Sequence, residues 1–574
     1  MNQLLVFFPW LIWLLPLASV PFAPLAAKAG HKAVWLYSII VSLSSLFFSA
    51  ISAYTFRSAS SSEIAEWVSL LSVPLEITVD GLSLLVSLLV SFLVLLVIIY
   101  SLSYIKNGYA RYYSLILLFS GSMLGLVMAG NLIQFYFFWE FVGICSALLI
   151  AFWSDKEAAR KAGMKAFIVT RIGDASLLVA IFFAYSLLGI TSFSGILDGF
   201  TKQPHSYLQI FGILVLVGAM GKSAQVPLHG WLPDAMEGPT TVSALIHAAT
   251  MVNAGVYLIV RLSPLYESSI LLSYIVITVG VLSSFIGGLA ALGADDIKRV
   301  LAYSTISQLG IMFTSVGMGV ASLAVYHLVS QGLFKALGFL SAGAVIESVG
   351  TRNMNQMGGL WRKMKFTYVG FLLSVLAMSG MPPLVGFWSK ESIVLASERS
   401  ALYYLLLISS VLTSVYSFRA LFKTFHGVAN TTSQASDPHP SMTLPIVILS
   451  LSVIFGWVFL SSQQLVHFIS FLPYTAYYTS FATIALGFIP SWLAYQIYSA
   501  KTGQIVFSSP LAKGLKQFLL KGLGFDTAYE FFAAAFNSFS KFAASIQTGK
   551  LQYNVALIFG TLVILLLLGA VGLL

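Results

Sequence analysis

The sequence contains one cysteine, Cys145, in 574 residues. A single thiol forms no intramolecular disulfide, four-cysteine zinc site or iron–sulfur cluster, so such centres are excluded within this chain. A glycine-rich dinucleotide fingerprint after a strand is also missing. We therefore expect no cofactor in this chain, and any redox chemistry must occur in other proteins. Cys145 lies in an apolar run, where packing is its expected role.

Charged residues are scarce as well. They make up 9% of the chain, against about a quarter in an average soluble domain, while 58% of the residues are hydrophobic. Bilayers need runs of about 20 apolar residues, because no water is present there to satisfy backbone groups, and such runs recur nearly end to end. The formal charge of +10 would also fit nucleic acid. Its basic residues are scattered through short connections, however, so we expect a lipid bilayer and no nucleic acid as partner.

The apolar runs predict an all-α polytopic membrane protein of about sixteen transmembrane helices. The expected spans are residues 4–27, 33–55, 82–104, 112–130, 132–153, 163–188, 207–227, 240–262, 270–292, 300–319, 322–346, 367–396, 402–425, 442–462, 478–499 and 552–574. The N-terminus turns apolar without a basic region, which favours a retained first helix over a signal peptide. Residues 501–550 are too polar to span, and apolar positions from Phe525 to Phe542 recur at helical spacing. This pattern predicts an amphipathic helix along the membrane surface, with an ordinary amphipathic linker as the alternative.

The distribution of basic residues predicts the topology. They fall mostly in alternate connections, which the positive-inside rule places on the cytoplasmic or matrix face. The connection that holds Glu63, Glu66, Glu76 and Asp80 is acidic, so both termini are expected on the opposite, non-cytoplasmic side. Asp234 and Glu237 depart from the pattern, as acidic residues on the predicted inner face. We expect a prokaryotic plasma membrane, or alternatively the membrane of an energy-transducing organelle.

Two charged residues stand in the first half of the chain where charge is costly. Insertion scales give a penalty of at least about 2.5–3.5 kcal/mol at mid-bilayer, so each such residue marks a candidate functional site. Glu140 lies in an aromatic run, and Lys222 lies shortly before Pro227, which must interrupt the helix. A helix broken at membrane depth usually lines a cavity. We expect Glu140 and Lys222 to pair across helices, either functionally or as a structural ion pair.

Further polar residues form possible relays. His327, Gln331 and Lys335 stand at spacings of four and share one helical face, where a polar stripe can hold a chain of water. His247 is a further relay candidate, although an isolated buried histidine is more often a satisfied core residue.

Another charged candidate pair lies earlier in the chain. Arg171 and Asp174 can pair at i, i+3 on one helix. We weigh a structural and a functional role for Asp174 equally.

A second proline break points to an internal repeat. Pro382 and Pro383 disrupt the span 367–396, and Lys390 with Glu391 follows. Lysines beside two broken helices indicate two inverted repeats of five helices, as in transporters with ion sites at interrupted helices. The expected parts are N-terminal helices in 1–110, a first repeat in 111–262, a second in 263–430, two helices in 431–500, the lateral helix in 501–550 and a final anchor in 551–574.

The motifs resemble a known family. Residues 221–248 read GKSAQVPLHGWLPDAMEGPTTVSALIHA, which resembles the signature of the antiporter-like subunits of respiratory complex I. Blocks at Val79, at Trp139 with Glu140, at residues 295–310 and at Phe334 with Lys335 are similar in order. The segment near Gly524 and the closing span resemble the distal subunit, called subunit L or subunit 5.

The resemblance implies roles for single residues. Glu140 and Lys222 match a proton-channel pair, His247, His327 and Lys335 match a central relay, and Lys390 matches the lysine of the opposite half-channel. Gln331 stands where many relatives carry a second relay histidine, so water or direct transfer would have to connect His327 with Lys335. The lateral segment also looks shorter than in many bacterial relatives.

The resemblance also implies a function. By this resemblance, the chain is expected to be a proton-translocating membrane subunit of an NADH-, ferredoxin- or F420-linked quinone oxidoreductase. Its expected main partner is an adjacent antiporter-like subunit. The enzyme is then a translocase whose redox centres lie elsewhere. A multisubunit Na⁺/H⁺ antiporter uses the same core and stays open as an alternative. The membrane half of an inorganic-carbon uptake pair fits the lateral segment poorly.

Overall fold

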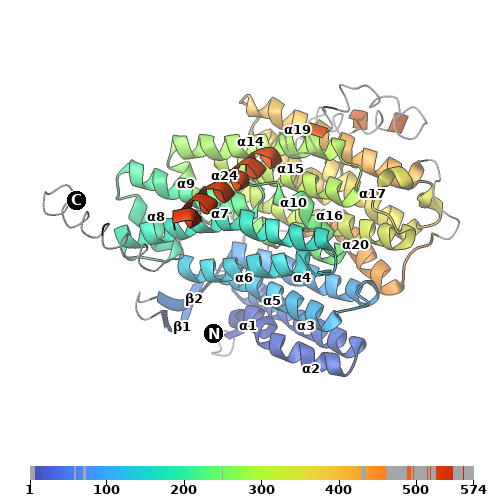
Figure 1. The fold of residues 1–574 in the computed structure, drawn as a ribbon, viewed down its shortest axis with the longest axis horizontal. Helices are drawn as coiled ribbons and strands as arrows, with labels where there is room; N and C mark the ends of the chain where they lie inside the picture. The colour runs from blue at the N-terminus through green and yellow to red at the C-terminus, as the bar shows by residue number, and fades with distance from the viewer. Residues whose placement is uncertain are drawn as a thin grey trace. The chain divides into compact units, whose positions relative to one another are not determined.

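The computed structural model describes most of the chain, namely residues 7–56, 60–68, 73–248, 250–427, 435–460 and 525–546, with isolated residues from 488 to 560. Helices dominate these stretches (Figure 1), which confirms the expected all-α class. Twelve helical spans among the described residues are long and apolar enough to cross a membrane. They are α1–α2 (Phe8–Lys28), α3 (His31–Thr55), α4 (Gly81–Tyr104), α5 (Tyr109–Met128), α6 (Leu132–Ile150), α7 (Glu157–Leu188), α11–α12 (Thr240–Arg261), α14 (Ile270–Gly293), α15 (Ile297–Gly317), α16 (Ala321–Val349), α19 with its π-turn (Leu402–His426) and α20 (Pro440–Val458).

The count of sixteen expected spans is not reached, for two reasons. The spans 478–499 and 552–574 lie outside the continuous described stretches. The spans 207–227 and 367–396 are interrupted. The first is α9 (His205–Lys222), and the second is α17 (Lys365–Ser379) followed by α18 (Val385–Ala396).

Among the described helices, three are broken inside the bundle. α9 ends at Lys222, five residues before Pro227, and helix resumes only in α10 (Trp231–Asp234), so the break is earlier than expected. The expected continuous helix 240–262 is also wrong. It divides into α11 (Thr240–Ala248) and α12 (Met251–Arg261).

The break between α11 and α12 has no glycine or proline beside it. Polar side chains take over the freed backbone acceptors instead. The Thr250 hydroxyl donates to the Leu245 carbonyl at 2.5 Å, and the Asn253 amide donates to the Ala248 carbonyl at 2.7 Å. Such bonds let irregular backbone persist where water is scarce.

Side-chain caps fix where several helices begin. Asp80 accepts from the Ser83 amide at the start of α4, Asn131 from the Gln134 amide at the start of α6, and Asp296 from the Lys298 amide at the start of α15, each at 2.8 Å. Each cap satisfies a backbone donor that a helix leaves open at its N-terminus. The polar positions inside α6 and α15 therefore have a fixed register.

The acidic connection after α3 forms a β-hairpin, which the sequence reading did not predict. β1 (Ser60–Val68) pairs antiparallel with β2 (Val73–Val79), with two register shifts. Asp80 follows β2 and forms an ion pair with Arg261 at the end of α12. Burial alone would raise the pKa of the Asp80 carboxyl, but Arg261 outweighs it and holds this pKa below its ordinary value. The hairpin end is thus tied to the broken helix.

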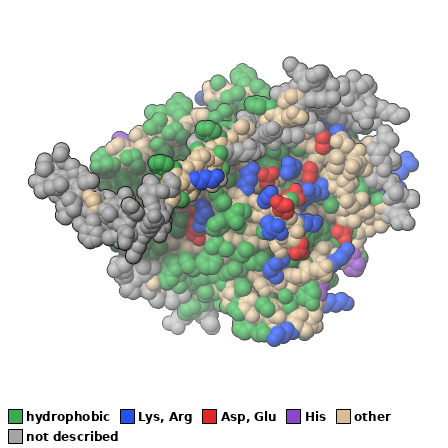
Figure 2. Space-filling model, viewed as in Figure 1, with side chains coloured by type: hydrophobic (Ala, Val, Ile, Leu, Met, Phe, Trp, Pro, Cys, Tyr) green, Lys and Arg blue, Asp and Glu red, His purple; other side chains and the backbone are tan. Residues whose placement is uncertain are grey.

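Ion pairs on the predicted inner face explain the two acidic residues that departed from the topology pattern. Asp234 pairs with Lys165 at 2.7 Å and Arg299 at 3.4 Å, and Glu237 pairs with Arg352 at 2.9 Å. Figure 2 shows acidic and basic side chains gathered over the place of α10 in Figure 1. The acidic residues neutralise local basic ones, so they leave the positive-inside pattern intact.

Residues 517–574 form a second compact unit. Within it, α24 (Phe525–Ile546) is a helix of 22 residues, about 33 Å long at 1.5 Å per residue. Phe531, Phe536, Phe539 and Phe542 are between 64% and 72% exposed. The helix expected in the lateral segment is therefore present, and it carries large apolar side chains with high exposed fractions.

Candidate functional site

Asp174 of α7 is the centre of a buried cluster between α6, α7 and α9. One carboxylate oxygen lies 3.2 Å from the ammonium of Lys222 and 3.5 Å from Nε of Arg171. The other accepts a hydrogen bond of 2.5 Å from the Trp139 indole. Lys222 and Asp174 are 0% and 1% exposed, so the buried lysine charge depends on this carboxylate for compensation.

Glu140 belongs to the same cluster through a different partner. It forms an ion pair with Arg171, which in turn contacts Asp174. The expected direct pair of Glu140 with Lys222 is therefore replaced by two pairs linked through Arg171. The reason is that α7 packs closely along α9, which presents Asp174 to Lys222. The predicted i, i+3 pair of Arg171 with Asp174 is confirmed.

A glycine on α6 allows the lysine to reach this position. A Cβ atom at Gly143 would lie 2.3 Å from the Lys222 ammonium and 3.2 Å from an Arg171 nitrogen. No side chain other than hydrogen fits there while the cations stay in place. Gly143 stands three residues after Glu140, and the sequence reading did not single it out.

A second cluster joins α15, α16 and α18 around His327. Nδ1 of its ring lies 2.9 Å from the Ser389 hydroxyl on α18, and Nε2 lies 3.0 Å from the Gln308 side-chain oxygen on α15. The Gln308 amide nitrogen donates to the Thr413 hydroxyl of α19 at 3.3 Å. Both ring nitrogens of a fully buried histidine are thus bonded to neutral groups.

Lys335 lies two turns further along α16 and also has neutral partners. Its ammonium donates to the Ser304 hydroxyl, to the Leu301 carbonyl at 3.4 Å and to the Met378 sulfur at 3.3 Å. Among the described residues no carboxylate pairs with it within 4 Å, although it is 1% exposed. Dipoles alone therefore offset the cost of burying this group.

Gln331 and His247 form a separate contact. The Gln331 amide donates to the His247 backbone carbonyl at 3.4 Å, and the His247 ring packs on Phe339 at 4.7 Å. The three residues of the predicted stripe, His327, Gln331 and Lys335, all lie on buried α16. Gln331 bonds to α11, while His327 and Lys335 each bond to α15, and no hydrogen bond joins these three side chains to one another.

Lys390 and Glu391 lie on α18, shortly after the break between α17 and α18. They are 4% and 6% exposed. Within the described stretches, the Lys390 ammonium has no hydrogen-bond partner. It lies near His327, as one of the two cations that act on that ring, together with Lys335. Because burying a cation inside a membrane span is energetically costly, Lys390 is a candidate functional residue.

The sequence reading missed the neutral partners of the second cluster, namely Gln308, Ser304, Ser389 and Thr413. Serine, threonine and glutamine are common in membrane helices, so composition does not mark them. One signal was present, because Ser304 and Gln308 stand four apart and share a face of α15.

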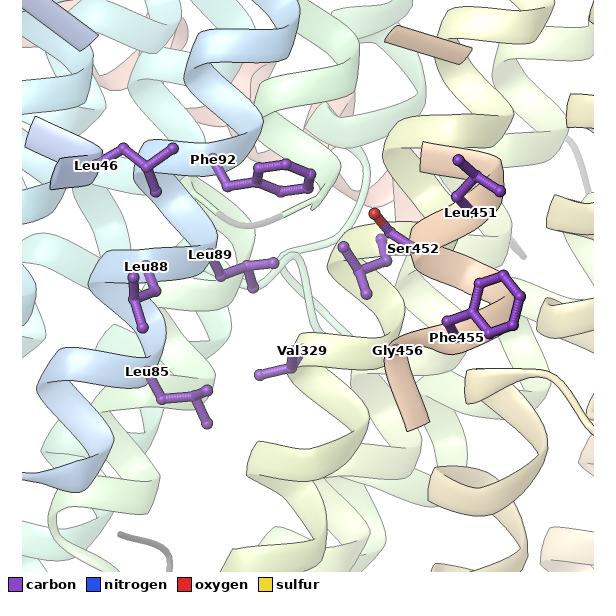
Figure 3. A pocket seen from close by; sticks show the side chains of 11 residues that line it. Leu46, Leu85, Leu88, Leu89, Phe92, Val329, Leu451, Ser452, Phe455 and Gly456 are labelled. Carbon is purple, nitrogen blue, oxygen red and sulfur yellow. The ribbon is translucent and has the colours of Figure 1, made fainter. Parts of the chain in front are cut away.

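An apolar cavity of about 490 Å³ borders α16 on its other side (Figure 3). Leu85, Leu89, Val329 and Phe455 are among its lining side chains. The one hydroxyl in the lining, that of Ser452, already donates to the Ile448 carbonyl at 2.9 Å. Among the described residues, the lining of this cavity therefore offers no free polar group to an ion or to a polar path.

Comparison with known sequences identifies relatives of the whole bundle. A profile described as "NADH:quinone oxidoreductase/Mrp antiporter, TM" matches residues 129–417, and one described as "NADH-Ubiquinone oxidoreductase (complex I), chain 5 N-terminus" matches residues 67–113. The chain is 39% identical over 502 residues to NAD(P)H-quinone oxidoreductase chain 5 of Picosynechococcus sp., covering 78% of this chain and 76% of that protein. With the chloroplastic subunit 5 of Mesostigma viride it shares 38% over 495 residues, covering 79% and 76%.

Solved structures show the same fold. A chain of the Mrp complex from Dietzia sp. matches with a TM-score of 0.86 and 26% identity, covering 98% of this chain and 63% of that one. A chain of the archaeal membrane-bound sulfane sulfur reductase matches with a TM-score of 0.71 over 80% of this chain and 96% of its own length. Its identity of 22% supports likeness of fold alone. Both buried clusters lie inside the shared bundle.

Proposed function

Because the chain belongs to the family of NAD(P)H-quinone oxidoreductase chain 5 proteins, the antiporter-like membrane subunits of complex I-type enzymes, we propose that it moves protons on its buried lysines, histidine and carboxylates. The observation that carries the proposal is Lys222. It is a fully buried ammonium at the end of a broken helix, held by one carboxylate. A charge at that depth is expensive and is retained where it serves transport.

The geometry supports different roles for the cluster around Asp174 and the cluster around His327. Lys222 holds a proton while Asp174 faces it, and Arg171 links Asp174 to Glu140, so a shift of Arg171 changes the charge around the lysine. Lys335 and His327 hold protons further along the bundle, and Lys390 stands at the second break. Quinone reduction in other subunits supplies the energy, and the electron donor is NADH, NADPH, ferredoxin or F420.

The inverted five-helix repeats and the placement of both termini on the non-cytoplasmic side belong to this proposal. The two lysines beside broken helices, Lys222 and Lys390, support the repeats. The basic residues on alternate connections support the topology. His247, Gln331 and Glu391 complete the proposed set of transport residues.

An adjacent antiporter-like subunit is the proposed partner of α24. Deleting residues 525–546 removes a helix whose exposed phenylalanines have the chemistry of an interface, so we expect the complex to lose subunits. Native gels of membranes from deletion and wild-type strains measure this directly, with Lys541→Ala as a control on the same helix. An intact complex after the deletion would leave α24 only the role of a linker.

The function itself is tested on the native complex. Affinity purification through this chain should recover iron–sulfur subunits, and in sealed vesicles donor oxidation should drive proton uptake that does not require Na⁺. Recovery of a complex without redox subunits that exchanges Na⁺ for protons would refute the proposal.

That second outcome defines the alternative, a multisubunit Na⁺/H⁺ antiporter. The match to a chain of the Mrp complex over 98% of this chain keeps it open as a function of the same fold. The curated relatives that match at 38–39% identity are quinone oxidoreductase chains, which favours proton transport in a quinone oxidoreductase over Na⁺/H⁺ exchange.

A further inference from the structure

The hydrogen bonds around His327 define which nitrogen of its ring can accept a proton. The Gln308 amide nitrogen points to the Thr413 hydroxyl at 3.3 Å, which leaves the Gln308 oxygen toward His327 Nε2 at 3.0 Å. An amide oxygen only accepts, so Nε2 must carry the hydrogen. In the neutral ring Nδ1 is then the free acceptor.

Nδ1 faces Ser389, which has a second acceptor within reach. The Ser389 hydroxyl lies 2.9 Å from Nδ1 and 3.3 Å from the Gly386 carbonyl. When the ring is neutral, the hydroxyl donates to Nδ1. When the ring is protonated, Nδ1 donates to the hydroxyl oxygen and the hydroxyl hydrogen turns to the Gly386 carbonyl. Both protonation states of His327 are therefore satisfied without moving a helix.

Ser389 also occupies a special place in the chain. It lies on α18 four residues past Val385, where the helix resumes after the break, and directly precedes Lys390. Ser389 is 0% exposed and Lys390 is 4% exposed, and the Lys390 ammonium has no hydrogen-bond partner among the described residues. The bond between His327 and Ser389 joins the α16 polar face to this broken helix.

Gln331 does not provide this connection. Its amide donates to the His247 carbonyl rather than to His327 or Lys335. The charged side chains that act on His327 are Lys390 from α18 and Lys335 from α16. Its two hydrogen-bond partners, Gln308 from α15 and Ser389 from α18, are neutral, and so is Thr413 of α19, which bonds to Gln308.

We propose that Ser389 transfers protons between His327 Nδ1 and the Lys390 end of the broken helix, and that Gln308 is the positioning residue that fixes the His327 tautomer for this step. The Lys390 ammonium gives its proton to a bridging water molecule, which passes one of its own protons to Ser389 Oγ, so that the water is restored and Lys390 becomes a neutral amine. The Ser389 O–H bond breaks as the Nδ1–H bond forms, and the incoming proton restores the hydroxyl. The products are a neutral donor and an imidazolium, and the reverse step returns them. This step rests on the proposed proton transport.

The experiment uses the native complex in sealed vesicles and measures protons taken up per quinone reduced. Ser389→Ala should lose as much of this ratio as Lys390→Ala, while Ser389→Thr, which keeps a hydroxyl, should restore most of it. Ser392→Ala is the matched control, because Ser392 lies on the same helix and, among the described residues, its hydroxyl donates to the backbone of that helix, to the Trp388 carbonyl at 2.7 Å. It should keep the wild-type ratio.

Gln308 is tested by conservative rescue. Gln308→Leu removes the acceptor of Nε2–H and should lower the ratio, whereas Gln308→Glu keeps an acceptor oxygen and should recover much of it. The neighbouring Thr305→Val is the control, because the Thr305 hydroxyl bonds to the Leu301 carbonyl of its own helix at 2.9 Å. Equal losses in Gln308→Leu and Gln308→Glu would overturn the positioning role.

Two results separate the failure of this step from failure of the function. A wild-type ratio in Ser389→Ala beside a lowered ratio in Lys390→Ala would reject Ser389 and leave proton transport standing. A larger loss in Gln331→Leu than in Ser389→Ala would place the path along α16 and also reject it. Wild-type ratios in both Lys222→Ala and Lys390→Ala would reject the proposed function itself.

Discussion

The cluster of α6, α7 and α9 and the cluster of α15, α16 and α18 bury lysines in opposite ways. Lys222 faces the Asp174 carboxylate at 3.2 Å, and Arg171 with Glu140 extends this into a network of four charges. Lys335 faces a hydroxyl, a carbonyl and a sulfur. The first cluster therefore depends on charge compensation, and the second depends on dipoles.

This difference predicts different sensitivities. Removing one partner of a buried ion pair leaves an uncompensated charge, which is costly. Removing one neutral partner from an ammonium leaves the remaining dipoles and costs less. The first cluster is thus a place where motion of one charge affects its neighbours, whereas in the second the Lys335 ammonium keeps other neutral partners when one is removed.

The largest expected effect follows from removing Asp174. Asp174→Ala leaves Lys222 and Arg171 without their shared carboxylate, so we expect a loss of about 3–5 kcal/mol in the free energy of unfolding. Ser304→Ala, the matched change at Lys335, removes one hydrogen bond to a charged group and should cost about 1.5–3 kcal/mol. Thermal or denaturant unfolding of the purified complex measures both. Equal losses would remove the distinction between the two clusters.

A smaller structural change at Gly143 should sharpen the comparison. Gly143→Ala places a methyl group where the Lys222 ammonium lies, and the flexible lysine can withdraw without unfolding α6. We expect an assembled complex with lowered proton uptake per quinone reduced. Gly288→Ala in α14 is the control, because its new Cβ would meet nothing closer than 3.4 Å. If Gly143→Ala pumps like wild type, the position of the ammonium is not critical.

The smallest expected loss of stability follows from changing Asp80. Like Lys222, Asp80 is a charged residue with an oppositely charged partner, Arg261, but it lies at the end of a helix. Its pKa lies below the ordinary value of 3.8 in the folded protein, because Arg261 outweighs the effect of burial. Ionised Asp80 therefore stabilises the fold above the unfolded pKa, and this contribution is lost as pH falls through the lower folded pKa. Asp80→Asn keeps an acceptor for the α4 cap but should cost about 1–3 kcal/mol at neutral pH.

The pH dependence checks this assignment. The difference in melting temperature between wild type and Asp80→Asn should shrink as pH is lowered toward and below the ordinary pKa. A difference that stays constant with pH would show that the mutation acts through packing or capping and not through the charge.

The sequence was sufficient for the class of fold and for most membrane spans, because apolar length has one physical meaning in a bilayer. It was also sufficient to single out Lys222, His327, Lys335 and Lys390, which are buried, and Glu140, which is partly buried, since each is an unusual residue in its span. It was insufficient for their partners. Two carboxylates, at Glu140 and Asp174, were within range of Lys222 on the expected helices, and only the packing of α7 along α9 decides between them.

The broken helix at α11 and α12 was missed for a related reason. Prolines near α9 and between α17 and α18 indicate the other two breaks in the sequence. Between α11 and α12, the backbone is interrupted beside threonine and asparagine side chains, which also occur in regular helices. The role of Gln308 also cannot be read from the sequence. It depends on Thr413, which lies on a distant helix and orients the Gln308 side-chain amide.

The most direct test of the central claim is the number of protons taken up per quinone reduced in sealed vesicles that contain equal amounts of wild-type or Lys222→Ala complex. Lys222→Ala leaves Asp174 bonded to Arg171 and Trp139, so the complex should assemble and still reduce quinone. The account predicts a lowered proton ratio in this variant. A wild-type ratio at equal complex content would contradict it.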